Sequence, residues 1–524
     1  MTGSGNRPEA TPSPESDDSR RQRFGIGLLL LLLLCFRIAY LAMVPFDLIH
    51  DEAYYWDWSR QLDWCYYSKP PGIAWLNAST MALLEPTTFA VRLPAAILSV
   101  ATVGFAYLLG SSIYNRRVGL AAAAILCATP GNAAAGVMMT IDSPFLLCWI
   151  AALYFFWRML QRQSDRWKWV LMTTCAVGVG LLFKQTMLAF PVLAAGFAWI
   201  SSEDRREWRT VSFWFCGLGA AGFLMPMLYW NSQHDWITFA HTGGHFDAEL
   251  TTLWRQISMG LEFVASQIGL ISPITWCMLL VCAWLGIRHW QSIDRSERYL
   301  LWFWGGPVLA ITLLSFRQRV EPNWPAPFYA SGIILLAAVA TGATRLRLPE
   351  WTLRRSLAVG VAAVMLTYSL PFFISGFGLK GSSIDVAVRM WGWQTLAEQV
   401  DQSLANMPQG EEAVLIVVGD RGIAAELAFY LPQHPHVCLW DGNGRVDSQY
   451  DIWGMPADLN ARKVVLVTKS GLPARLAESF GDVESMGEVS TAIGGNRRHE
   501  LQLWHASDFQ GWETVAAADV PVVR

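Results

Sequence analysis

An acidic pair and a lysine enclose an aromatic-rich stretch soon after the first long apolar segment. Asp51 and Glu52 are adjacent, and Lys69 follows them in a Tyr-Tyr-Ser-Lys-Pro-Pro sequence. Sugars offer hydroxyls to carboxylates and apolar faces to aromatic rings, and a phosphate needs a cation, so this stretch can form a site for a sugar on a phosphate. The alternative is an interfacial helix with its rings among lipid headgroups and its charges solvated. The tyrosines expected to contact substrate are Tyr54, Tyr55 and Tyr67.

Other ionisable residues lie just beyond the ends of later apolar segments. Asp142 opens one such segment in Thr-Ile-Asp-Ser-Pro, where capping of the helix start explains it as well as catalysis or sugar binding does. His234 and Asp235 can hydrogen-bond a sugar, coordinate a metal or cap a helix. Glu321 and Asn323 stand in a proline-rich turn that forms either a wall of the site or a purely structural turn. Four basic residues are also candidates for the site. They are Arg92, which pairs with a carboxylate or extends to phosphate, and Lys184, Arg317 and Arg319.

The chain as a whole has the composition of a polytopic membrane protein. Of its 524 residues, 53% are hydrophobic and only 15% are charged. A net charge of -3 argues against nucleic acid as a partner. The stretch 167–200 is too long for one span, because its helix would measure about 51 Å against a ~30 Å hydrocarbon core, so we expect two short helices there. The other segments of spanning length are 24–44, 87–111, 118–136, 143–157, 211–230, 257–287, 299–316, 325–343 and 356–375.

Basic residues are concentrated in alternate connections between these segments. By the positive-inside rule, this alternation predicts about eleven transmembrane helices with the N-terminus in the cytoplasm and the chain after about residue 376 outside. The ionisable residues named above then come from separate connections but share the outer face. Ionisable groups at membrane depth are costly and are retained mainly for function.

Composition also divides the chain into parts. Residues 1–23 are polar and read as a disordered cytoplasmic tail, 24–380 as a transmembrane domain with a first external loop at 45–86, and 383–524 as a small extracytoplasmic α/β domain. In that last part, 413–418 and 464–468 look like buried strands, and 499–504 alternates like an edge strand.

The first loop carries a resemblance to a known family. DEAYYWDWSRQLDWCYYSKPPGIAWL, at 51–76, resembles the first-loop motif of the bacterial dolichyl-phosphate-mannose-protein mannosyltransferase-like family, GT-C membrane glycosyltransferases related to the lipid A aminoarabinose transferases. Further matches follow in order at AVRLP (90–94), TIDSP (140–144), WNSQHDW (230–236) and VEPNWP (320–325). The resemblance covers roughly 25–375, with 420–430 in addition.

This resemblance implies an inverting transfer from a polyprenyl-phosphate sugar, with Asp51 as the general base and Glu52 orienting the acceptor or Asp51. The leaving phosphate gains negative charge, so a cation is expected to stabilise it. Lys69 is the first candidate, and Lys184, Arg317 and Arg319 follow it. Tyr54-Tyr55 stands where the aminoarabinose transferases lead us to expect an Arg-Tyr pair, which argues against carrying over their sugar and acceptor.

The prediction is therefore an α-helical polytopic GT-C protein with a small C-terminal soluble α/β domain, in the bacterial cytoplasmic (inner) membrane with its active site facing the periplasm. Its expected partners are the polyprenyl-phosphate sugar donor, an envelope acceptor (lipid A, glycan, lipid or protein) and membrane lipids. No cofactor is expected to be required, although a divalent cation and its ligands stay open. The alternative is a transporter or flippase of lipid-linked saccharides, for which internal repeats and charges at the bilayer midplane are typical.

Overall fold

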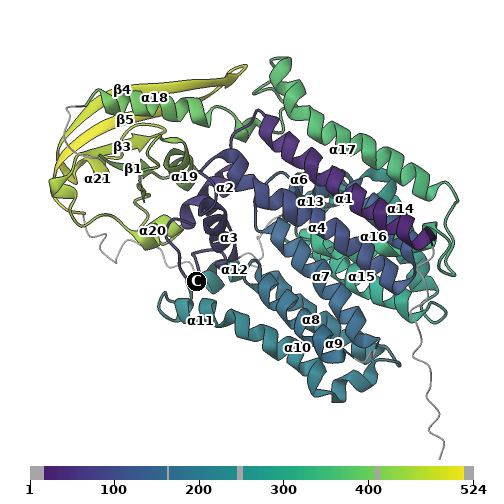
Figure 1. The fold of residues 1–524 in the computed structure, drawn as a ribbon. Coiled ribbons are helices and arrows are strands. Elements are labelled where there is room, and N and C mark those ends of the chain that lie inside the picture. The colour runs from purple at the N-terminus through teal and green to yellow at the C-terminus, as the bar shows by residue number, and fades with distance from the viewer. Residues whose placement is uncertain (1–16, 162–164, 245–251, 408–412, 513–524) are drawn as a thin grey trace, which may run out of the picture.

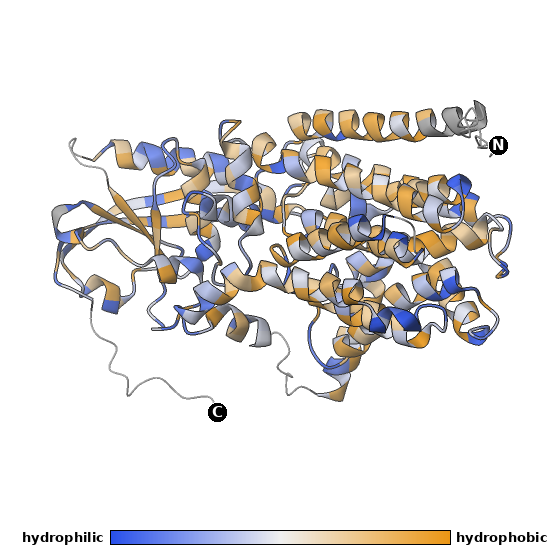
Figure 2. Ribbon diagram, turned by 60° about the horizontal axis from the view of Figure 1, so that its bottom comes forward, coloured by the Kyte–Doolittle hydropathy of each residue, from blue (hydrophilic) through white to orange (hydrophobic). Residues whose placement is uncertain are grey.

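The computed structural model describes residues 17–161, 165–244, 252–407 and 413–512 and shows a helical bundle joined to a sheet-containing part (Figure 1). Most of the expected tail at 1–23 lies outside the described residues, and the first helix already begins at Asp17. Apolar residues dominate the bundle helices, whereas the sheet-containing part is mixed (Figure 2). The bundle helices are α1 (Asp17–Met43), α4 (Thr88–Ile113), α5 (Arg116–Cys127), α6 (Pro130–Ala135), α7 (Asp142–Leu160), α8 (Arg166–Leu181), α9 (Ala189–Ile200), α10 (Val211–Ala221), α11 (Met225–Ser232), α12 (Ile237–Gly244), α13 (Leu253–Ile271), α14 (Pro273–Arg288), α15 (Arg295–Ser315), α16 (Ala326–Ala340) and α17 (Thr352–Gly376).

Every segment expected to span the membrane contains helix, and the stretch 167–200 forms the two short helices predicted, α8 and α9. Within the described residues, five continuous helical segments have the length and apolar composition of a membrane span, or six if one bent pair counts as a span. The total of eleven spans therefore stays a prediction.

Two expected spans are interrupted. The segment 257–287 is not one helix: α13 and α14 meet at an angle of 112°. Ser272 between them has a φ of 84°, and Pro273 begins the next helix without an N–H to continue the first. The segment 118–136 likewise divides into α5 and α6 just before Pro130. Sequence hydropathy does not register either break, because both sides are apolar.

The C-terminal part is a five-stranded sheet with helices, in the strand order β2-β1-β3-β5-β4. β1 pairs in parallel with β2 and β3, and β5 pairs antiparallel with β3 and β4. The prediction of an edge strand at 499–504 was wrong, because the long strand β4, which was not foreseen, covers that edge. The elements are α18 (Trp393–Ala405), β1 (Val414–Val418), α19 (Arg421–Tyr430), β2 (Val437–Trp440), α20 (Gln449–Trp453), β3 (Val464–Thr468), α21 (Ala474–Ala477), β4 (Phe480–Gly494) and β5 (Arg497–Phe509).

The loop at 45–86 joins the two parts. It contains α2 (His50–Trp58) and α3 (Gly72–Met81), and α2 packs against α19 of the C-terminal part (Figure 1). One continuous cluster of buried apolar side chains runs from α2 through α19 to the sheet. Trp56, for example, meets Phe429 edge to face with 4.9 Å between ring centroids. The C-terminal part therefore shares a hydrophobic core with the loop, and burial of apolar surface holds them together.

A close backbone approach fixes the second half of the loop. The N–H of Gly72 donates to the carbonyl of Leu182, at 2.7 Å, in the turn that connects α8 to α9. A Cβ on residue 72 would lie 2.6 Å from that carbonyl oxygen, so only glycine fits. This contact brings the chain around Lys69 next to the turn that carries Lys184.

Candidate active site

Glu52 is completely buried at the start of α2, and hydrogen bonds occupy its carboxylate. Arg92 of α4 donates from Nη2 to Oε2 at 2.7 Å and from Nε to Oε1 at 2.9 Å. The N–H groups of Met139 and Ile49 donate to the same carboxylate. Of the two expectations for Arg92, pairing with a carboxylate is confirmed. Glu52 joins three segments of the chain and does not present an oxygen toward an acceptor.

Asp51, its neighbour, has the opposite environment. Its side chain is 52% exposed, and its only ion-pair partner among the described residues is Arg421, whose Nη2 lies 4.0 Å from Oδ1. An exposed pair at this distance contributes little to stability. The Asp51 carboxylate is therefore open to a substrate.

Asp142 is held in place by two other segments. Lys184 donates from Nζ to Oδ1 at 2.8 Å, and the Asn323 side-chain amide donates to Oδ2. Asp142 is the first residue of α7, after the N-cap residue Ile141, and its side chain makes no cap hydrogen bond. The alternative that it caps the helix was therefore wrong, and its carboxylate instead joins the starts of three apolar segments.

Lys69 lies close to both carboxylates, with an ammonium that has no ion-pair partner among the residues described. The pKa of Lys69 is lowered to about 8, mainly by burial and also by the nearby charges of Lys184 and Arg421, while Asp51 and Asp142 oppose the shift. Since Asp142 neutralises Lys184, Lys69 is the lysine that can receive an anion here.

The aromatic residues of the loop serve mainly as core. Trp56, Trp58 and Tyr66 are buried, and the Tyr54 hydroxyl accepts the N–H of Gln449 while its ring meets Tyr450. The expectation that Tyr54 contacts substrate is thus corrected, because the C-terminal part covers it. Tyr55 and Tyr67, the other two tyrosines of that expectation, lie near the charged groups. Burial raises the pKa of both hydroxyls; Asp51 and Asp142 raise that of Tyr55 further, and Arg421 opposes the rise at Tyr67.

The remaining candidates are not brought to these carboxylates. The His234 ring stacks on Trp230 at 3.8 Å between centroids, and its Nδ1 faces the Trp230 carbonyl. Asp235 stands in a turn with a φ of 50°. Arg317, Arg319 and Glu321 are exposed and form no ion pair with Asp51 or Asp142 in the part of the chain that the structure describes.

Arg421 was missed by the sequence interpretation. It is the first residue of α19 and lies about 370 positions after Asp51, so no local pattern links the two residues. Its guanidinium carbon lies 5.2 Å from the centre of the Tyr54 ring. The match of 420–430 to the family was the one signal that could have indicated it.

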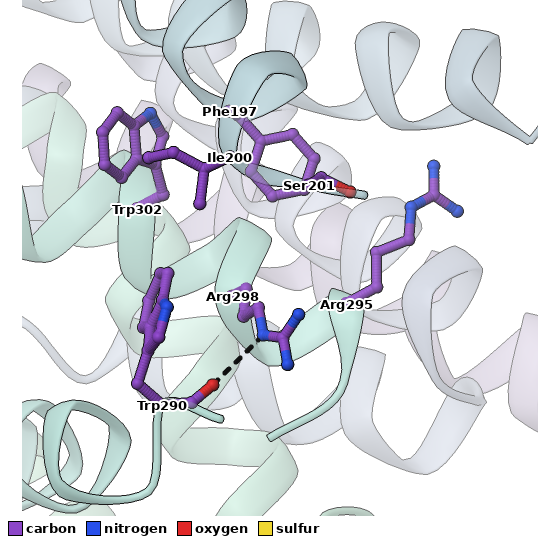
Figure 3. A pocket seen from close by; sticks show the side chains of 7 residues that line it. All are labelled: Phe197, Ile200, Ser201, Trp290, Arg295, Arg298 and Trp302. Atoms are coloured by element: carbon purple, nitrogen blue, oxygen red, sulfur yellow. Dashed lines mark hydrogen bonds between the residues drawn. The ribbon is translucent and has the colours of Figure 1, made fainter. Parts of the chain in front are cut away.

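Two cavities lie apart from these residues. A small one is formed by Phe197, Ile200, Ser201, Trp290, Arg295, Arg298 and Trp302 (Figure 3). It adjoins the end of α9 and the start of α15, whereas Lys184 precedes the start of α9 and Asn323 follows the end of α15. The other, of about 410 Å³, lies between α18, β4 and the segment around Asp47. No group of three or more His, Cys, Asp or Glu side chains suited to a metal ion occurs in the described residues.

Comparison with known proteins identifies the family. Residues 68–230 match the profile of the dolichyl-phosphate-mannose-protein mannosyltransferase family. The lipid A galacturonosyltransferase RgtD of Rhizobium johnstonii is 30% identical over 348 residues, which cover 66% of this chain and 71% of RgtD. The chain belongs to this family of membrane glycosyltransferases. The resemblance seen in the first loop is thereby confirmed, and the transporter alternative is set aside.

A second relative of this glycosyltransferase is the undecaprenyl phosphate-alpha-4-amino-4-deoxy-L-arabinose arabinosyl transferase of Edwardsiella ictaluri. It is 23% identical over 79% of this chain and 86% of its own. The crystal structure of ArnT from Cupriavidus metallidurans bound to undecaprenyl phosphate aligns with a TM-score of 0.64 and 16% identity, over 92% of this chain and 98% of that one. This likeness confirms the GT-C fold.

Proposed function

We propose that this glycosyltransferase transfers a sugar from a polyprenyl-phosphate donor to lipid A at the outer face of the bacterial inner membrane. The observation that carries the proposal is the Lys69 ammonium, which is not neutralised and lies near the half-exposed Asp51 and the fixed Asp142. Because RgtD is the more similar of the two relatives, a galacturonic acid is the proposed sugar.

The reaction needs one base and one cation. Asp51 removes the proton from an acceptor hydroxyl while the hydroxyl oxygen attacks the anomeric carbon, forming the new glycosidic bond with inversion. The bond between that carbon and the phosphate oxygen breaks, and the polyprenyl phosphate leaves with an added negative charge. Lys69 stabilises this charge, and the Asp142 carboxylate, held by Lys184 and Asn323, positions the sugar hydroxyls.

Glu52 and Arg92 act through position. Their buried pair holds the start of α2 against α4 and so fixes the backbone that carries Asp51. A requirement for a cofactor is not part of the proposal, because protein cations can stabilise the leaving phosphate. Addition of EDTA is expected to leave turnover unchanged.

Purified protein with a labelled polyprenyl-phosphate galacturonate and lipid A tests the proposal. Labelled lipid A and free polyprenyl phosphate should appear together in equal amounts. Intact donor that crosses the bilayer of a vesicle without release of polyprenyl phosphate would contradict it and favour a flippase.

The proposed orientation has eleven spans, the N-terminus in the cytoplasm and the sheet-containing part outside. The bent pair of α13 and α14 decides this orientation. If the pair is re-entrant and does not cross the membrane, every later segment lies on the opposite side from the one proposed. An alkaline phosphatase fusion at residue 380 should be active. An inactive fusion in an inserted protein would show that the parity is wrong.

A further inference from the structure

The C-terminal part contributes a charged side chain to the mouth of the site. Arg421, at the start of α19, places its guanidinium over the Tyr54 ring at 5.2 Å and 4.0 Å from the carboxylate of Asp51. Its side chain is 45% exposed, so one side of the guanidinium is free for a ligand.

This placement depends on both parts of the molecule. Tyr54 belongs to α2, its hydroxyl accepts the N–H of Gln449, and its ring packs against Tyr450 at 5.4 Å. Asp420, directly before Arg421, caps α19 by accepting the N–H groups of Gly422 and Ile423. The base of Arg421 and the ring beneath its guanidinium are thus both fixed, while its tip is not.

The charges around Asp51 leave two cations available. Lys184 is neutralised by Asp142 at 2.8 Å. Lys69 has no ion-pair partner within the described ranges, and Arg421 has only the long, exposed contact with Asp51. A phosphodiester donor carries one negative charge, which Lys69 matches. A neutral sugar would leave Arg421 with only that exposed contact, whereas a uronic acid supplies a second anion.

We infer that Arg421 binds the carboxylate of the transferred sugar and makes the C-terminal part a selector of uronate donors. The inference rests on the proposed function. A sugar ring with its anomeric carbon beside Asp51 has its C6 carboxylate on C5, which is joined to the anomeric carbon through the ring oxygen. That carboxylate is therefore within reach of a side chain that borders Asp51. The planar guanidinium can donate two parallel hydrogen bonds to a carboxylate, which a lysine cannot reproduce.

The test compares two synthetic polyprenyl-phosphate donors, one with galacturonate and one with galactose, in the same transfer assay. The wild type should prefer galacturonate. Arg421→Gln should lower kcat/KM for galacturonate about 10- to 100-fold, as expected for the loss of hydrogen bonds to a charged group, and leave galactose transfer unchanged. Arg421→Lys should retain part of the preference.

Arg462→Gln is the matched control, because Arg462 lies in the same part, is 44% exposed and has its own ion pair with Asp458. It should leave both donors unaffected. An equal loss with both donors for Arg421→Gln would overturn the inference, since Arg421 would then serve the phosphate or the fold, and so would no loss at all. Wild-type preference for galactose would overturn the inference but leave the transferase proposal standing. Use of neither donor would overturn both.

Discussion

Asp142 and Asp51 both adjoin Lys69, but their surroundings differ. Asp142 is 18% exposed, and Lys184 and Asn323 occupy both of its oxygens. Asp51 is 52% exposed, and its one ion-pair partner within the described ranges is the distant guanidinium of Arg421. A carboxylate with both oxygens occupied keeps its geometry, whereas an open one can accept a proton from an incoming hydroxyl. We infer that the carboxylate on the transmembrane side of the site is an ordering group, and that the carboxylate bordering the C-terminal part is the reacting group.

The largest effect is expected from removal of the proton acceptor. Asp51→Asn keeps shape and hydrogen bonding, so folding and donor binding should survive. Turnover should fall on the order of 10² to 10⁴ for the loss of a general base, which corresponds to about 3 to 5 kcal/mol in the activation barrier. Single-turnover measurement of product formation decides it.

Glu85→Gln, an exposed acidic residue of the same loop, is the control and should turn over normally. If Asp51→Asn stays near native while Asp142→Asn abolishes turnover in well-folded protein, the assignment of the two carboxylates is reversed.

Replacing the adjacent Glu52 should lower the stability of the protein, whereas replacing Asp51 should lower turnover. Glu52→Gln leaves Arg92 charged and buried without its counterion, and breaking such a pair typically costs about 3 to 5 kcal/mol of stability. Thermal unfolding of the purified protein should show a clear loss. Unchanged unfolding with lost turnover would instead give Glu52 a direct role beside Asp51.

Replacing Lys69 tests the role of the cation near the two carboxylates. Lys69→Ala should lower kcat/KM for the donor about 10- to 100-fold, as a charged hydrogen bond to phosphate is lost, and Lys69→Arg should retain part of it. Lys168→Ala, an exposed lysine beside the opposite end of α7, should have no effect.

The pH dependence offers a second measurement on Lys69. Because its pKa is lowered to about 8, the ammonium loses its proton as pH rises through that value, and the wild-type kcat/KM should fall there. The decline should disappear in Lys69→Arg, since arginine stays protonated. A decline that persists in Lys69→Arg would assign it to another group.

Part of this arrangement could be predicted from sequence. The alternation of basic residues placed Asp142, Lys184 and the turn of Asn323 on one face of the membrane, and the structure shows these three in contact. Helix length alone divided 167–200 correctly. Both arguments use constraints that the bilayer places on each segment separately, namely its thickness and the positive-inside rule.

The remainder depends on contacts between distant segments. No residue next to Glu52 in the sequence indicates that it forms a buried ion pair with Arg92. The aromatic residues of α2 give the same sequence pattern whether they contact a sugar or pack against Phe429. Arg421 comes near Asp51 only because α19 packs on α2. The bend between α13 and α14 follows from backbone geometry at Ser272, which apolar composition does not record.

The smallest expected effect tests the border with the C-terminal part itself. Tyr54→Phe keeps the ring beneath Arg421 but removes the hydroxyl that accepts the N–H of Gln449. A buried N–H without an acceptor costs about 1 to 3 kcal/mol. Hydrogen exchange at the start of α20 should therefore accelerate, while turnover changes little because Asp51 and Lys69 keep their places. Tyr229→Phe, an exposed tyrosine of α11, should change neither property. If Tyr54→Phe lowered turnover as far as Asp51→Asn does, the hydroxyl would take part in the chemistry, and the division between an ordering side and a reacting side would have to be redrawn.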